Sequence, residues 1–101
     1  MEAGKRKKLQ KAGWKVGTAT DLLGLTSEEA AYVEVKLHLA KELVNRRRSL
    51  GLTQVAVAKR IRSSQSRVAK MEAGDPTVSI DLLVRSLLAL GHKPEAVAKA
   101  I

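Results

Sequence analysis

The sequence contains no cysteine and no phenylalanine, and it has only one tryptophan and one tyrosine among its 101 residues. The lack of cysteine excludes disulfides and thiolate metal sites, and it fits a reducing compartment. The two histidines, His38 and His92, lie far apart without the spacing of metal ligands, so we expect no metal site. With so few aromatic residues, the core must be built from leucine, valine, isoleucine and alanine.

Long apolar runs are also missing. No stretch approaches the roughly 20 residues that cross a membrane, and the basic N-terminus is not followed by the hydrophobic segment of a secretory signal. We therefore expect a cytoplasmic protein with no membrane partner. The sequence shows no nucleophile–base pair, glycine-rich phosphate loop or carboxylate dyad with a basis for proximity. We accordingly expect no enzyme activity, no catalytic residue and no cofactor.

What the sequence has in excess is positive charge. The formal net charge is +9 and the pI is near 10.3, which indicates an anionic partner. Residues 1–15 hold six basic residues and one acid, and residues 46–70 hold eight basic residues and no acid. A surface that is only soluble usually mixes both signs, so these two blocks favour a binding function.

Capping residues and apolar spacing predict an all-α fold, and no segment alternates like a strand. Thr26 and Glu29 form a predicted capping box, and the long helix that follows runs to about Leu50, closed by Gly51. Shorter helices are predicted over residues 54–61, 65–72, 80–90 and 94–101. The first three of these are expected to begin after the capping residues Thr53, Ser64 and Ser79.

The long helix is predicted to be amphipathic, with one broad face toward the core. This face carries Val33, Leu37, Leu39, Ala40, Leu43, Val44, Arg47 and Leu50. The leucines of residues 80–90 are expected to form core and dimer interface rather than a ligand pocket, so no small-molecule ligand is expected. They are Leu82, Leu83, Leu87, Leu88 and Leu90. We expect residues 1–25 to be a basic N-terminal extension and residues 26–101 to be one helical domain.

The two helices at 54–61 and 65–72 are separated by three residues, which is the arrangement of a helix-turn-helix. Ala58 supplies the small residue that a close helix crossing needs, while Val68 and Met71 supply the inward face of the second helix. The outward face stays polar, so it can enter a major groove and meet base edges. That face carries Gln65, Ser66, Arg67 and Lys70.

The stretch from Leu52 to Gly91 resembles the Xre-like, phage-repressor class of helix-turn-helix domain. The matching segments are LTQ, VAKRI, SSQSRVAKMEAG and SIDLLVRSLLALG. Upstream, GWKVGTATDLLGLTSEEA is similar to antitoxins of the HigA class, which belong to type II toxin–antitoxin modules. The resemblance implies a five-helix, lambda-repressor-like fold.

The resemblance also implies roles for single residues. Base contacts are expected from Gln65, Ser66, Arg67 and Lys70, with Arg67 able to contact base or phosphate. Phosphate contacts are expected from Gln54, Arg62, Arg48 and Ser64. Arg47 and Glu72 match an arginine and a glutamate that often form a structural salt bridge in this class.

Arg62 departs from the family, which usually has glycine at this turn. A left-handed backbone would strain an arginine by about 1 kcal/mol. Either the turn differs from the family's, or the strain is tolerated because Arg62 contacts a phosphate.

These observations predict a sequence-specific transcriptional repressor that binds a pseudo-palindromic operator in double-stranded DNA as a homodimer. The HigA-like resemblance implies that it also neutralises a RelE/HigB-like ribonuclease toxin and represses its own operon. Two alternatives stay open: a phage-type regulator without a toxin partner, and a module that uses the helix-turn-helix as a scaffold to bind protein or RNA.

Overall fold

The computed structural model describes Gly24 and residues 26–101. The predicted N-terminal extension therefore lies almost entirely outside the described residues. The chain divides into two compact units, Met1–Glu34 and Val35–Ile101. The second unit contains all the single residues for which the sequence predicts a contact with DNA.

The described residues form five helices and no strand, which confirms the all-α prediction. The helices are α2 (Ser27–Ser49), α3 (Gln54–Arg60), α4 (Gln65–Glu72), α5 (Ile80–Ala89) and α6 (Pro94–Ala100). Each boundary falls within about one residue of its prediction. Across residues 26–101, no helix is both long and apolar enough to span a membrane.

The helices begin where side-chain caps were predicted. Thr26 N donates to Glu29 Oε1 at 2.9 Å, and Glu29 N donates to Thr26 Oγ1 at 3.1 Å, which completes the capping box. Three later helices start in the same manner, because a hydroxyl oxygen accepts from the amide three residues on, at 3.0 to 3.2 Å. These caps are Thr53, Ser64 and Ser79.

Helices α2 to α5 all end in the same backbone motif. A residue with positive φ follows the C-cap, and two amide groups then donate back into the last turn. After α3, Arg62 N donates to Lys59 O at 3.3 Å and Ser63 N donates to Ala58 O at 2.8 Å. The residues at the left-handed position are Gly51, Arg62, Gly74 and Gly91.

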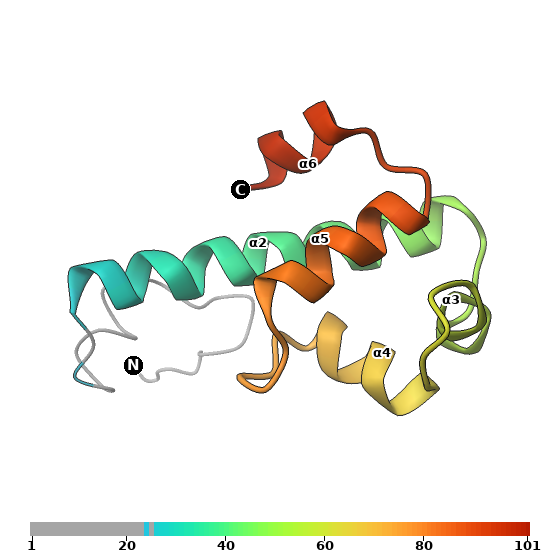
Figure 1. Ribbon diagram of the computed structural model, residues 1–101, viewed down its shortest axis with the longest axis horizontal. Helices are drawn as coiled ribbons and strands as arrows, with labels where there is room; N and C mark the ends of the chain where they lie inside the picture. The colour runs from blue at the N-terminus through green and yellow to red at the C-terminus, as the bar shows by residue number, and fades with distance from the viewer. Residues whose placement is uncertain (1–23, 25) are drawn as a thin grey trace. The chain divides into compact units, whose positions relative to one another are not determined.

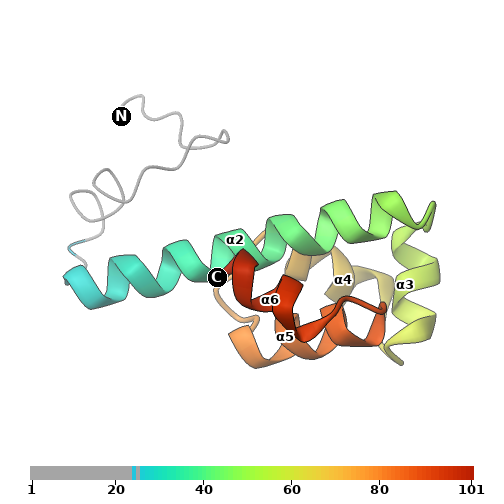
Figure 2. The same ribbon diagram turned by 90° about the horizontal axis from the view of Figure 1, so that it is seen from above.

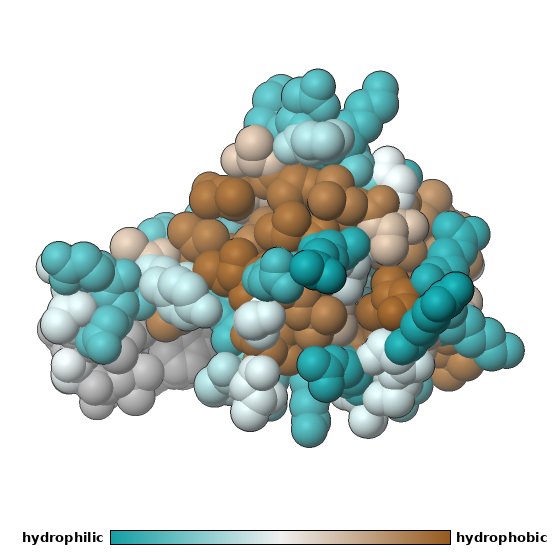
Figure 3. Space-filling model, viewed as in Figure 1, coloured by the Kyte–Doolittle hydropathy of each residue, from teal (hydrophilic) through white to brown (hydrophobic). Residues whose placement is uncertain are grey.

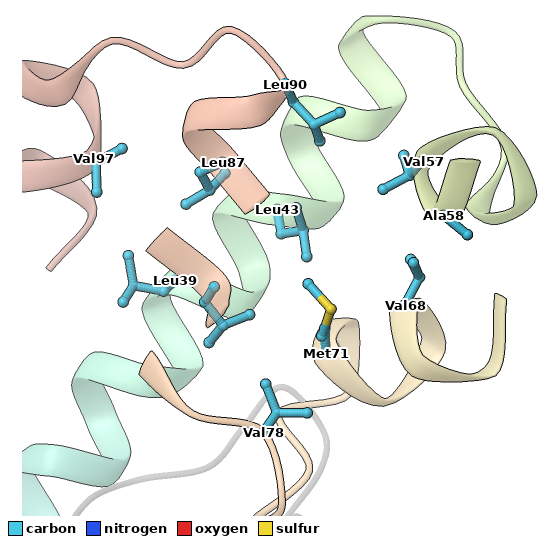
Figure 4. Packing of buried hydrophobic residues seen from close by; sticks show 11 residues of the cluster. Leu39, Leu43, Val57, Ala58, Val68, Met71, Val78, Leu87, Leu90 and Val97 are labelled. Atoms are coloured by element: carbon cyan, nitrogen blue, oxygen red, sulfur yellow. The ribbon is translucent and has the colours of Figure 1, made fainter. Parts of the chain in front are cut away.

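The core of the second unit is aliphatic and draws on all five helices (Figure 4). Leu43 of α2, Met71 of α4 and Leu87 of α5 are fully buried at its centre. Figure 2 shows the second half of α2 beside α5 and α6, with α3 near its C-terminal end. Other buried members are Leu39, Val57, Ala58, Val68, Val78, Leu83, Leu90 and Val97.

The predicted core face of α2 is wrong at its last residue. Leu50 is 37% exposed, because it lies past the last helical turn, where the chain leaves the core. Val55, near the start of α3, is also exposed. Lys36 is buried on the apolar side of α2, and its Nζ donates to Pro76 O at 3.2 Å. This contact ties α2 to the turn between α4 and α5.

Candidate nucleic-acid interface

Helices α3 and α4 form the helix-turn-helix (Figure 1). Val57 and Ala58 of α3 are buried together with Val68 and Met71 of α4, which fixes the crossing of the two helices. The turn between them bends at Arg62, whose φ is +57°. The left-handed turn that the resemblance implies is therefore present, although an arginine stands where that class usually has glycine. Of the two explanations for this departure, the one that required a different turn is excluded.

The outer side of α4 carries the predicted base-contacting residues. Gln65, Ser66, Arg67 and Lys70 are all exposed, and we call them the α4 edge. A small polar hollow of about 170 Å³ lies beside this edge, and Thr77 of the following loop contributes to its wall. The other lining residues are Ser64, Ser66, Arg67, Lys70 and Val78.

The expected pair between Arg47 and Glu72 forms in the structure. Arg47 Nε donates to Glu72 Oε2 at 2.6 Å, and Arg47 Nη2 donates to Glu72 Oε1 at 3.1 Å. Both side chains are mostly buried, at 16% and 8% exposed. The hydrogen bond to Glu72 raises the pKa of the Arg47 guanidinium, although partial burial opposes this change. The pair ties the end of α2 to the end of α4.

Glu72 is also the start of a chain of hydrogen bonds that the sequence did not reveal. Gln54 Nε2 donates to Glu72 Oε1 at 3.1 Å, and Gln65 Nε2 donates to Gln54 Oε1 at 2.7 Å. The first residue of α3 therefore holds the first residue of α4. The sequence feature that could have indicated these hydrogen bonds is the glutamine at the first position of each helix of the motif.

The four predicted phosphate-contacting residues lie at helix ends or in the turn. Gln54 opens α3, and Arg48 lies exposed in the last turn of α2. Ser64 Oγ accepts from the Arg67 amide at 3.2 Å, and it lies 3.4 Å from Ser66 Oγ, with which it shares a hydrogen bond. Arg62 is exposed in the turn between α3 and α4. Their contacts with DNA, like those of the α4 edge, stay predictions.

The sequence did not predict two further groups of residues that lie beside the α4 edge. Thr77 and Val78 reach the hollow beside the α4 edge, and Arg85 of α5 lies with Arg67 along a second hollow. Neither could be found by spacing, because the loop and α5 come near α4 only through the packing of the core. Among the described residues, no group of three or more histidines or acids could hold a metal ion.

Comparison with known protein families agrees with this geometry. A family model described as "Helix-turn-helix domain" matches residues 38–100, which covers the second half of α2 through α6. Searches of curated proteins and of solved structures found no significant match. The matched segment spans more than half of the chain and contains the α3–turn–α4 motif described above. The chain therefore belongs to the helix-turn-helix domain family.

Proposed function

We propose that this protein is a sequence-specific transcriptional repressor that binds DNA through the α4 edge. Membership of the helix-turn-helix family indicates a DNA-binding regulator. The observation that carries the more specific proposal is the held position of Gln65, whose amide is bound by Gln54 while the neighbouring residues of α4 stay exposed. A polar side chain held in one orientation on an exposed helix edge is suited to hydrogen bonding with base edges.

The charge around this edge supports an anionic partner. Residues 46–70 hold eight basic residues and no acid, and these residues include the end of α2, all of α3 and most of α4. Basic side chains displace counterions from DNA phosphates, so binding should weaken steeply as salt concentration rises. This role requires no chemical step, and we propose that the protein is not an enzyme.

The test is a binding series on DNA from upstream of the coding sequence, measured by fluorescence anisotropy. The double variant Gln65→Ala with Lys70→Ala should lose about 30-fold or more in preference for its site over unrelated DNA, because it removes two base contacts and each good one contributes about 1–3 kcal/mol of discrimination. A matched control is Lys93→Ala, an exposed charge just before α6. An unchanged preference in the double variant would exclude base recognition by α4.

We further propose that the protein binds its operator as a homodimer. Apolar side chains gather over α5 and α6 (Figure 3), and Leu88 and Ile101 are 44% and 56% exposed. Two copies related by a twofold axis would present two α4 helices to half-sites about one helical turn apart, so the operator should be pseudo-palindromic. Sedimentation equilibrium of Leu88→Glu should show weaker self-association than the parent protein; equal association would place the interface elsewhere.

The antitoxin role is a finer proposal that rests on the resemblance of the segment GWKVGTATDLLGLTSEEA to HigA-class antitoxins. Most of that segment lies outside the described residues. The proposal is that the protein neutralises a RelE/HigB-like ribonuclease and represses its own operon. A toxin-sized reading frame beside the gene, and co-purification with its product, would support this. Without them, a phage-type regulator that lacks a toxin partner is the better description.

A further inference from the structure

A second hollow lies between the turn after α3 and one side of α5. Its volume is about 420 Å³. Four arginines line it, one from the end of α3, one from the turn, one from α4 and one from α5, and no acidic residue does so. They are Arg60, Arg62, Arg67 and Arg85, and we call this feature the arginine hollow.

The charges in the arginine hollow are largely without partners. The side chains of Arg60, Arg62 and Arg67 make no hydrogen bond or ion pair with any residue that the structure describes. Arg85 pairs with Asp81 at 3.1 Å, but both side chains are about three-quarters exposed, so water and salt screen this pair. Four guanidinium groups around one hollow repel each other and attract an anion.

A buried hydroxyl supplies a second, independent indication. Ser86 lines the same hollow and is only 2% exposed, yet its Oγ makes no hydrogen bond with any residue in the described part of the chain. A buried hydroxyl without a partner destabilises the folded protein. An oxygen of an anion in the hollow would accept this proton, just as it would accept from the arginines.

The backbone conformation of Arg62 is a third feature that indicates a binding site at the arginine hollow. Arg62 is the only non-glycine residue with positive φ in the described segments. Strained backbone conformations concentrate at binding sites, where a side chain with a function justifies the strain. Glycine would suit this turn better, but it would remove one of the four positive charges.

We propose that the arginine hollow binds a phosphate group. Planar guanidinium groups bind phosphate oxygens through paired hydrogen bonds, and the hollow offers four of them beside the buried Ser86 hydroxyl. The source favoured by the structure is the backbone of bound DNA, because Arg67 lines both this hollow and the polar hollow beside the α4 edge. This choice of source rests on the proposed function, whereas phosphate binding itself does not; a free phosphate-bearing molecule has the same chemistry.

The first experiment uses the full chain without DNA. Inorganic phosphate is titrated into labelled protein, and NMR signals of backbone amides and arginine Nε groups are followed. The largest shifts are expected at Arg62, Arg67, Arg85 and Ser86. The variant Arg85→Gln should weaken binding about tenfold, as for the loss of one charge-assisted hydrogen bond. The matched control is Lys59→Gln, which removes an exposed charge next to Arg60 but outside the hollow.

Two further variants separate phosphate binding from a structural role. Asp81→Asn frees Arg85 from its partner and should strengthen phosphate binding, whereas loss of a structural ion pair would weaken it along with Arg85→Gln. Ser86→Ala should weaken phosphate binding without lowering the melting temperature. Equal effects of Arg85→Gln and Lys59→Gln, or shifts spread over all basic residues, would overturn the proposal.

A second experiment identifies the source of the phosphate. Affinity for operator DNA is measured over a range of salt concentrations. If a backbone phosphate fills the arginine hollow, Arg85→Gln should reduce the slope of log K against log salt by about 0.9, with sequence preference unchanged. The control in this experiment is Lys93→Gln, which removes an exposed charge outside the basic block of residues 46–70. A slope equal to that of Lys93→Gln would assign the site to a free phosphate-bearing molecule. If the parent protein shows no sequence preference, the proposed function fails while the NMR result stands.

Discussion

The C-terminal ends of α3 and α4 have the same backbone and very different side chains. Both helices end with a residue in the left-handed region, with φ of +57° at Arg62 and +70° at Gly74. Both close with the same pair of amide-to-carbonyl hydrogen bonds. The last residue of α4, Glu72, is held by a buried ion pair, while the last residue of α3, Arg60, is exposed and without an ion pair among the described residues.

The difference shows that one turn is optimised for packing and the other for charge. At Gly74, an added Cβ would lie 2.7 Å from Leu37 Cδ2, so a side chain there would strain the backbone and displace the end of the Leu37 side chain. At Arg62 the backbone favours glycine equally, yet an arginine stands there. Stability alone does not account for that choice, which is why the turn after α3 is the better candidate for a binding role.

The largest expected effect is on the buried ion pair that holds the end of α4. Glu72→Ala should lower the free energy of unfolding by about 3 kcal/mol, because it leaves the mostly buried Arg47 with only the Leu52 carbonyl as partner. Urea unfolding measures this. The control Asp81→Asn breaks an exposed pair and should change stability by less than about 0.5 kcal/mol. Similar losses of stability in both variants would mean that the buried ion pair stabilises the protein no more than the exposed one.

Next in size is the glycine of the turn after α4. Gly74→Ala should cost about 2 kcal/mol, since it adds backbone strain and displaces the Leu37 side chain. Gly51→Ala places a Cβ in open space at the same backbone conformation, so it should cost only about 1 kcal/mol. Thermal unfolding of the two variants isolates the contribution of the Leu37 contact. If the two losses are equal, space at Gly74 is not limiting.

At the turn after α3, a substitution is expected to stabilise the folded protein rather than destabilise it. Arg62→Gly should raise stability by about 0.5 kcal/mol, because relief of about 1 kcal/mol of backbone strain exceeds the added entropy of the unfolded chain. Affinity for DNA should fall in the same variant. Urea unfolding and binding measured on one preparation would show both changes. A loss of stability would indicate that Arg62 has a structural role instead.

The smallest expected effect is on the pH dependence of stability, and it involves Asp75, which follows Gly74. Hydrogen bonds from the Thr77 hydroxyl and amide lower the pKa of the Asp75 carboxyl below its usual value of 3.8. The charged form is favoured in the folded protein, so its contribution to stability is present above that value and is lost as pH falls through the lowered pKa. Unfolding between pH 6 and pH 2.5 should therefore be less pH-dependent in Asp75→Asn than in the parent protein.

Much of the fold could be predicted because it depends on local chemistry. Thr53, Ser64 and Ser79 cap helices through amides three residues away, and the apolar spacing of α4 places Val68 and Met71 inside. The bond from Lys36 to Pro76 spans 40 residues and ends on a carbonyl, which carries no sequence signal. Arg85 joins Arg67 at one hollow only because the core packs α5 near α4. The sequence thus predicted which polar residues share the outer face of α4, but not that Thr77 and Arg85 lie beside them.

The hydrogen-bond chain that ends at Gln65 has a direction. A carboxylate can only accept, so Gln54 must turn its amide nitrogen toward Glu72 and its oxygen toward Gln65. Gln65 must then use one N–H inside the protein, which leaves its oxygen and its other N–H for a ligand. Adenine presents the complementary donor and acceptor in the major groove. A largely buried carboxylate thereby selects, through two amides, which way round the side-chain amide of Gln65 is presented to a ligand.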